Sequence, residues 1–257
     1  MKYIEYNCKN RVGYISFLRK EKRNAINNQF INEFNKAFSL AEKDKKCKII
    51  VIQNTGNVFC SGADLKYLEE IRNKTESENI QDSRKLQKLF DNIYNSQKIT
   101  ISKIKGHAIA GGCGIISCTD FNYCTPNSKF GFTEVKIGFI PAIVSLYSIE
   151  KIGFSNTKKM FLSGEIINSE KAKKLGMIDK IIDETKIDEE VNIITEEFCK
   201  TLSNISISET KKMLQKIQQN NFKKNKELVV KLNAKSRKTD EFKKGVDAFL
   251  NKKSIDW

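Results

Sequence analysis

The chain of 257 residues contains a single histidine, two prolines and no CxxC pair among its seven cysteines. One histidine excludes metal sites built from several histidines, and any Ser–His or Cys–His nucleophile pair would have to use His107. Without a CxxC pair, zinc ribbons and thioredoxin-like redox sites are disfavoured. The start of the chain lacks an apolar signal-peptide core, and no run of about 18 apolar residues occurs. We therefore expect a cytoplasmic protein with reduced thiols and no membrane partner.

Basic residues outnumber acidic ones, with 46 Lys and Arg against 31 Asp and Glu, a formal net charge of +15. Such a balance fits affinity for phosphate groups, either of nucleic acid or of a phosphorylated cofactor. However, the lysines are spread along the chain, and abundant Lys and Asn with little Arg is also what an AT-rich coding sequence produces by drift. We favour drift and expect no nucleic-acid partner. The stretch 36–48, with Lys43, Lys45 and Lys46, keeps RNA binding as an alternative.

The order of strand-like and helix-like patterns indicates an α/β fold. Residues 48–53 and 99–104 are short β-branched segments typical of buried strands. Residues 28–43 place their apolar side chains on one helical face. After about residue 145 the pattern is mostly helical. We therefore predict a core over residues 1–195 that carries the functional site, followed by a helical region over residues 196–257.

Three segments combine small residues with the predicted end of a strand: FCSGADLK at 59–66, GHAIAGGCG at 106–114 and FGFTEVKIG at 130–138. Small residues after a strand let a ligand approach the backbone closely. A Gly-Gly pair that opens a helix leaves free backbone N–H groups, and a second donor from the SGAD turn would complete a site for a developing oxyanion. The alternative is that these glycines only permit tight turns. Neither glycine segment matches a GxGxxG or Walker phosphate loop.

Glu134 lies among Phe130, Phe132, Val135 and Ile137. Apolar surroundings favour the neutral form of a carboxyl group and raise its pKa. A carboxyl group that takes and returns protons near neutral pH needs such a pKa. The alternative is a glutamate at the edge of a strand that faces water.

In this order and spacing, the three segments resemble the enoyl-CoA hydratase/isomerase (crotonase) superfamily. The likeness extends through FGFTEVKIGFIP at 130–141 and LSGEIINSEKAKKLGMIDKII at 162–182, from about residue 3 to the C-terminus. In appearance it is nearest to bacterial enoyl-CoA and methylglutaconyl-CoA hydratases. The resemblance implies a spiral of repeated ββα units and a helical C-terminal region that builds trimers or dimers of trimers. It also implies an acyl-CoA substrate, no metal, and no cofactor apart from the coenzyme A of the substrate.

The resemblance assigns roles to four positions. The backbone N–H groups of Ala63 and Gly111 would form an oxyanion hole for the thioester carbonyl, and Glu134 would act as acid and base. Hydratases of this family use a second glutamate, at the position that Gly114 occupies here. The Δ3,Δ2-enoyl-CoA isomerases similarly lack that earlier glutamate and keep the later one.

The absence of a carboxylate at position 114 favours an isomerase, whereas the wider sequence resembles hydratases. At this stage hydration of a 2-enoyl-CoA or 3-methylglutaconyl-CoA stays slightly ahead of isomerisation. A catalytically silent acyl-CoA-binding protein is a third alternative.

The same resemblance implies a set of residues that bind the coenzyme A moiety. They are Lys22, Arg23, Asn24, Ala25, Ala63, Asp64, Leu65, Lys66, Phe249 and Lys252. The loop at 22–25 would lie near the adenine and pantetheine, residues 63–66 would line the pantetheine channel, and the last two residues would contact the nucleotide end. The type and position of Asp64 also suit a turn or helix cap. Parts of residues 65–95 and 137–147 are expected to form the pocket wall.

Overall fold

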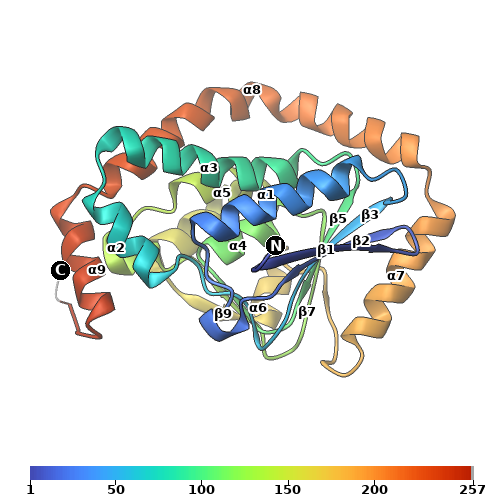
Figure 1. The fold of residues 1–257 in the computed structure, drawn as a ribbon, viewed down its shortest axis with the longest axis horizontal. Coiled ribbons are helices and arrows are strands. Elements are labelled where there is room, and N and C mark those ends of the chain that lie inside the picture. Colours follow the sequence, from blue (N-terminus) through green and yellow to red (C-terminus); the bar gives the residue numbers. More distant parts are fainter. Residues whose placement is uncertain (256–257) are drawn as a thin grey trace.

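The computed structural model describes residues 1–255, without the side chains of residues 219–224. Within this part of the chain the strands form a six-stranded and a four-stranded sheet (Figure 1). The larger sheet has the order β1 (Ile4–Lys9), β2 (Val12–Phe17), β3 (Ile49–Asn54), β5 (Ile99–Ile104), β7 (Phe121–Cys124) and β10 (Lys180–Ile181). The smaller sheet has the order β4 (Val58–Cys60), β6 (His107–Ile109), β8 (Lys129–Gly131) and β9 (Ile166–Asn168).

Successive strand pairs divide between the two sheets in a regular way. β3, β5 and β7 join the larger sheet in parallel, and the strand after each of them, β4, β6 or β8, joins the smaller sheet. Helices follow each pair: α2 (Leu65–Asn73) and α3 (Glu76–Tyr94), then α4 (Gly111–Cys118), then α5 (Ala142–Ser163). This succession is the spiral of ββα units that the family resemblance implied, which is therefore confirmed.

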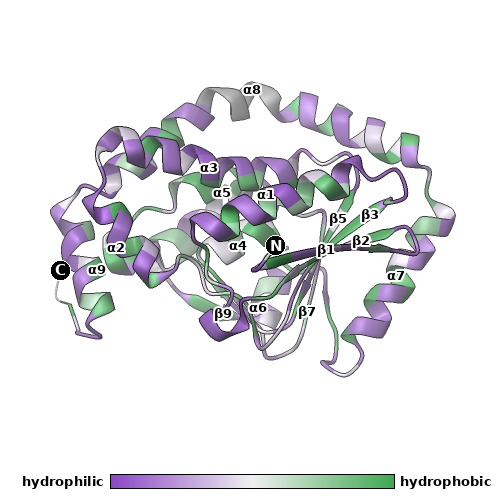
Figure 2. Ribbon diagram, in the orientation of Figure 1, coloured by the Kyte–Doolittle hydropathy of each residue, from purple (hydrophilic) through white to green (hydrophobic). Residues whose placement is uncertain are grey.

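The central strands β3 and β5 of the larger sheet are buried on both faces. Side chains alternate along a strand, so neighbouring residues enter different cores. On β3, Ile50 and Ile52 enter the main core with α1 (Asn28–Lys43). Ile49 and Val51 enter a second core with α7 (Ile187–Thr201). The predicted helix over 28–43 is confirmed, including its buried apolar face, and Figure 2 shows the alternation of polar and apolar residues along it.

The C-terminal region lies over the core. After α6 (Ser169–Lys174) and α7, the long helix α8 (Asn204–Ser236) passes along α3 and α5 (Figure 1). Then α9 (Asp240–Leu250) returns to α2 and to the short 3₁₀ helix η2 (Glu134–Ile137). The predicted boundary between residues 195 and 196 falls inside α7, and a division into two domains stays a prediction. In the described residues no helix has the length and apolarity needed to cross a bilayer.

Candidate active site

The three small-residue segments meet at one pocket. Ala63, Gly111 and Glu134 all line it, and its volume is about 780 Å³ including the opening to solvent. Most other lining side chains are apolar and come from α2, α3, η2 and the segment that begins α5. The predicted contribution of residues 65–95 and 137–147 to the wall is confirmed. Asn233 of α8 and Phe249 of α9 complete the lining, so the C-terminal region forms part of the site.

Two backbone N–H groups of this pocket have no hydrogen-bond partner among the described residues. Ile26 and Ala63 form a parallel β-bridge, in which Ile26 N–H donates to the Gly62 carbonyl oxygen at 2.8 Å and Asp64 N–H donates to the Ile26 carbonyl oxygen at 2.9 Å. The N–H of Ala63 takes part in neither hydrogen bond. Gly111 is the first residue of α4, where an N–H has no intrahelical acceptor. Within the described chain neither N–H donates a hydrogen bond. Two such donors in an apolar pocket suit an oxygen atom that gains negative charge.

Close backbone packing brings these two donors to the same pocket. Gly62 has φ +88°, and a Cβ there would lie 3.0 Å from the Cβ of Ala110. At Gly112 a Cβ would lie 2.6 Å from the Cys60 carbonyl oxygen, closer than real Cβ atoms approach. Both positions therefore need glycine, because the backbone from Cys60 to Gly62 is in direct contact with the start of α4.

Glu134 is the buried carboxyl group of the pocket. Its side chain lies in η2 and the residue is 8% exposed. Oε2 is buried and has no hydrogen-bond partner in the described part of the protein. Burial raises the pKa of Glu134 to about 7. The prediction of an apolar environment is confirmed, and the alternative of a water-facing glutamate at a strand edge is wrong, because β8 ends at Gly131 and the chain turns inward.

Helix α9 holds the Glu134 turn in place. A Cβ on Gly245 of α9 would lie 2.4 Å from the carbonyl carbon and oxygen of Ile137. Gly138 ends η2 at φ +65°. A Cβ on Gly138 would lie 2.5 Å from the carbonyl carbon and oxygen of Glu241 and 2.7 Å from the backbone nitrogen of Phe242. Direct backbone contact between α9 and η2 therefore sets the position of the acidic side chain.

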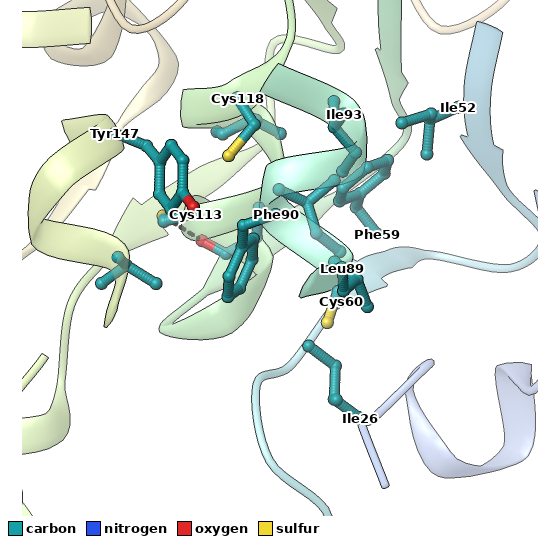
Figure 3. Packing of buried hydrophobic residues seen from close by; sticks show 14 of the residues in the cluster. Ile26, Ile52, Phe59, Cys60, Leu89, Phe90, Ile93, Cys113, Cys118 and Tyr147 are labelled. Carbon is teal, nitrogen blue, oxygen red and sulfur yellow. Dashed lines mark hydrogen bonds between the residues drawn. The ribbon is translucent and has the colours of Figure 1, made fainter. Parts of the chain in front are cut away.

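The position of the family's second glutamate is filled by hydrocarbon. A Cβ on Gly114 would lie 2.5 Å from Cγ1 of Val144 and 2.8 Å from Cε1 of Phe90, and both of these residues line the pocket. Phe90 itself is fully buried and packs against Tyr147, with ring centroids 5.8 Å apart (Figure 3). Among the lining residues that the structure describes, Glu134 is the one with a carboxyl group, and the packing leaves no room for a side chain at 114.

The predicted coenzyme A loop lies beside the 61–64 turn but is not part of the pocket lining. Ser61 N–H donates to the Arg23 carbonyl oxygen at 3.1 Å, which holds the 22–25 loop against the turn. Asn24 is fully buried and its Nδ2 donates to the Thr55 and Val58 carbonyl oxygens at 3.2 and 2.8 Å. Its contribution to binding would therefore come from holding the loop.

Asp64 has two structural contacts. It caps α2 by accepting from Lys66 N–H at 2.9 Å, and it pairs with Arg19 at 2.6 Å. Three side chains of the predicted set, Lys22, Arg23 and Lys66, are exposed near this turn.

The remaining members of the set divide between surface and pocket. Leu65 and Lys252 are exposed and do not line the pocket, and Ala25 is buried. Phe249 lies in the pocket itself, with 49% of the residue exposed. Coenzyme A binding by the set stays a prediction. Sequence reasoning missed Asn233 as a lining residue, since no local pattern distinguishes a polar residue of α8 that faces a cavity.

A buried carboxyl group with a pKa of about 7 and two backbone N–H donors line one mostly apolar pocket, an arrangement that suits an acid–base enzyme acting on a carbonyl compound. Comparison with known proteins identifies the family. Residues 7–257 match the family model described as enoyl-CoA hydratase/isomerase, and the chain belongs to this family.

Similar proteins agree with this assignment. A Thermus thermophilus protein named "Putative enoyl-CoA hydratase" is 30% identical over 95% of this chain and 96% of its own length. A Streptococcus mutans protein, trans-2-decenoyl-[acyl-carrier-protein] isomerase, is 25% identical over 98% of this chain and 96% of its own. The crystal structure of an enoyl-CoA hydratase from Bacillus halodurans superimposes with a TM-score of 0.89 at 23% identity, covering 96% of this chain and 99% of that one. The fold is the α/β crotonase fold with two sheets and C-terminal helices.

Proposed function

We propose that this protein is an enoyl-CoA isomerase that moves a double bond from the 3- to the 2-position of an acyl-CoA, with Glu134 as the only acid and base. The packing of Phe90 and Val144 around Gly114 carries this proposal, because it leaves one carboxyl group at the reacting centre. The sequence alone had kept hydration slightly ahead. The filled space at position 114 supports isomerisation over hydration, and we therefore propose it first.

The chemistry needs one carboxyl group and two donors. The thioester oxygen would accept hydrogen bonds from the Ala63 and Gly111 N–H groups, which makes the α-carbon more acidic. Ionised Glu134 would remove a proton from the α-carbon, and the electron pair would spread over the dienolate. The protonated carboxyl would then return that proton to the γ-carbon, leaving the double bond at the 2-position. No atom is gained or lost, so no activated water is required.

Hydration of a 2-enoyl-CoA, including 3-methylglutaconyl-CoA, is the second candidate. The name of the Thermus thermophilus relative favours it, and the hydroxyl-bearing residues Ser61 and Thr133 line the pocket. In this mechanism Glu134 would take a proton from water and deliver a proton to the α-carbon, while these hydroxyls orient the water. Loss of hydration in Thr133→Val, with isomerisation retained, would support a water-orienting role.

We further propose that the loop at 22–25 and the 63–66 turn bind coenzyme A, and that the protein assembles as a trimer or a dimer of trimers. Family membership and exposed apolar side chains on α8 support the assembly. RNA binding through residues 36–48 has less support, since Lys48 is buried and its Nζ donates to the Cys199 and Leu202 carbonyl oxygens.

The test is to identify products by mass spectrometry in ¹⁸O-labelled water. The substrates are 3-enoyl-CoA, 2-enoyl-CoA and 3-methylglutaconyl-CoA, and Glu134→Gln is the control. We expect an unlabelled 2-enoyl product of unchanged mass from 3-enoyl-CoA, absent with the variant. A labelled hydroxyacyl product from a 2-enoyl substrate would instead assign hydration. No turnover of any substrate, together with acyl-CoA binding, would favour a catalytically silent binder.

A further inference from the structure

Asn233 is a polar residue in the wall of an otherwise mostly apolar pocket. It lies on α8 and is 3% exposed, and it lines the same pocket as Glu134. Leu68, Leu86 and Phe90 are apolar members of the same wall. An amide group in such surroundings costs free energy unless its polar atoms find partners.

Neighbouring donors fix the orientation of the Asn233 amide. Its Oδ1 accepts from Ser83 Oγ at 2.9 Å and from Arg237 Nη2 at 2.9 Å. A guanidinium group only donates hydrogen bonds, so the oxygen of the amide must face Arg237. The Nδ2 group therefore points away from these partners, and over the described residues it donates to no protein acceptor.

A buried ionic network behind Asn233 keeps this arrangement rigid. Arg237 is 1% exposed, and its Nη1 pairs with Asp82 at 2.7 Å and donates to Asn79 at 3.3 Å. Asp82 also accepts from the hydroxyl of Tyr67, another pocket residue.

The side chains of this network carry a net positive charge next to the pocket. Lys74 lies 3.7 Å from the second oxygen of Asp82, so two cations face one carboxylate. The Nη2 of Arg237 donates to the Asn233 oxygen. The Nε of Arg237 is buried and has no partner in the described residues, but Arg237 does not line the pocket, whereas Asn233 does. Of these two side chains, Asn233 therefore offers its Nδ2 donor to a ligand. Both the donor and the charge balance favour an oxygen atom of the ligand.

We propose that Asn233 is a specificity-determining residue whose Nδ2 donates a hydrogen bond to an oxygen atom on the acyl chain, beyond the reacting double bond. The preferred substrates are then acyl-CoA thioesters that carry a hydroxyl, carbonyl or carboxylate oxygen, rather than plain hydrocarbon chains. This inference rests on the proposed acyl-CoA site, but not on whether the reaction is isomerisation or hydration.

The test compares binding of saturated acyl-CoA pairs of equal length, which undergo neither reaction. One member of each pair ends in a methyl group, and the other carries a hydroxyl, keto or carboxylate oxygen. Affinities are measured by calorimetry across a range of chain lengths, on the full chain and on Asn233→Asp. An aspartate at 233 still accepts from Ser83 and Arg237 but has no donor for the ligand. Ser83→Ala is the matched control, because it removes one support of the amide and leaves the donor in place.

We expect the wild type to bind one oxygen-bearing acyl-CoA about tenfold or more tightly than its methyl partner. In Asn233→Asp this preference should vanish, and for a carboxylate it should reverse, while the methyl partner binds within about twofold of wild type. Ser83→Ala should keep the preference. The hydroxyl, keto and carboxylate arms then identify the oxygen that is recognised.

Two outcomes would overturn the inference: no preference in the wild type, or equal weakening of both members of each pair in Asn233→Asp, as a merely structural residue would produce. Thermal melting of the variant separates misfolding from altered recognition. Failure of every acyl-CoA to bind would overturn the proposed function as well. Binding without any preference would overturn only the role of Asn233.

Discussion

At the scale of single residues, Glu134 combines burial, a pKa of about 7 and an oxygen without a partner in the described chain. An acid–base catalyst works best when its pKa lies near the working pH. Each of these properties leads to a measurement on the isosteric variant Glu134→Gln, which keeps the shape of the side chain and removes its ionisation.

Glu134→Gln should lower kcat by about 10²–10⁴-fold with a small change in KM, because proton transfer is lost while the pocket keeps its shape. In the wild type, kcat/KM should rise with pH through an apparent pKa of about 7, since the ionised form removes the first proton. Steady-state kinetics over a pH series tests both statements. A variant with wild-type turnover would remove Glu134 from the mechanism.

The same pKa shift makes the stability of the protein pH-dependent. The ordinary pKa of a glutamate is 4.5, and that of folded Glu134 is about 7. Between these values the folded chain holds a proton that the unfolded chain has released, so the free energy of unfolding falls as the pH rises through this window. Above about 7 the cost of the buried charge levels off at about 3 kcal/mol.

Glu134→Gln lacks this cost, so we expect it to be more stable than wild type by up to about 3 kcal/mol at alkaline pH. The difference should shrink towards pH 4.5. Urea denaturation of both proteins at acidic and alkaline pH measures it. An equal difference at every pH would show that ionisation of Glu134 is not its source.

Gly114 offers a test of the filled second-carboxylate position. Glycine to alanine inside a helix ordinarily stabilises by about 0.5–1 kcal/mol. Here the added Cβ would meet Val144 and Phe90, so Gly114→Ala should destabilise by about 1–3 kcal/mol. Adding Val144→Ala should recover part of this loss, and denaturation of the two single variants and the double variant measures the coupling. Purely additive effects would mean that the two positions do not compete for space.

At the scale of elements, α9 and η2 form a unit in which one backbone positions the other. Gly245→Ala would place a Cβ within 2.4 Å of the Ile137 backbone and move α9 away from η2. We expect at least a tenfold loss of kcat/KM, although Gly245 does not line the pocket, because a small displacement of a catalytic group is costly. Lys243→Ala, on the exposed side of α9, is the matched control and should change little. Equal kcat/KM of the two variants would show that the contact between α9 and η2 does not position Glu134 for catalysis.

At the scale of the whole molecule, α8 carries large apolar side chains that are more than half exposed in the described chain. Met213, Leu214 and Ile217 are 53%, 53% and 69% exposed. Three such neighbours are more than the scattered apolar residues of a monomer surface, and a second copy of the chain is the proposed cover.

We therefore expect a trimer or a dimer of trimers in light scattering after size-exclusion chromatography. Replacing Leu214 and Ile217 by glutamate should shift the protein to smaller species, because charges in an apolar interface are not compensated. Lys212→Ala, in the same helix, should leave the assembly unchanged. A wild type that elutes as a monomer at high concentration would contradict the proposal.

The sequence predicted a feature correctly where the residues that determine it are close together in the chain. The 3.6-residue period of Phe30, Phe34 and Phe38 was enough to predict α1. The apolar residues beside Glu134 suggested a raised pKa but left a water-facing glutamate open, and only the fold showed the burial that raises it. Periodicity is a short-range property that the sequence carries directly, whereas burial of a single side chain depends on the packing around it.

Two other features depended on residues that only folding brings together. One is the packing around position 114, which favours isomerisation in our proposal, and the other is the polar residue in the pocket wall. Position 114 is closed by side chains of α3 and α5, and Asn233 reaches the pocket from α8 while its oxygen is held by Ser83 and Arg237. Neither arrangement has a local pattern. Shape and partner geometry at a site are set by packing between distant elements, so the chain alone indicated a carboxyl group and two donors, and the tertiary structure decided what surrounds them.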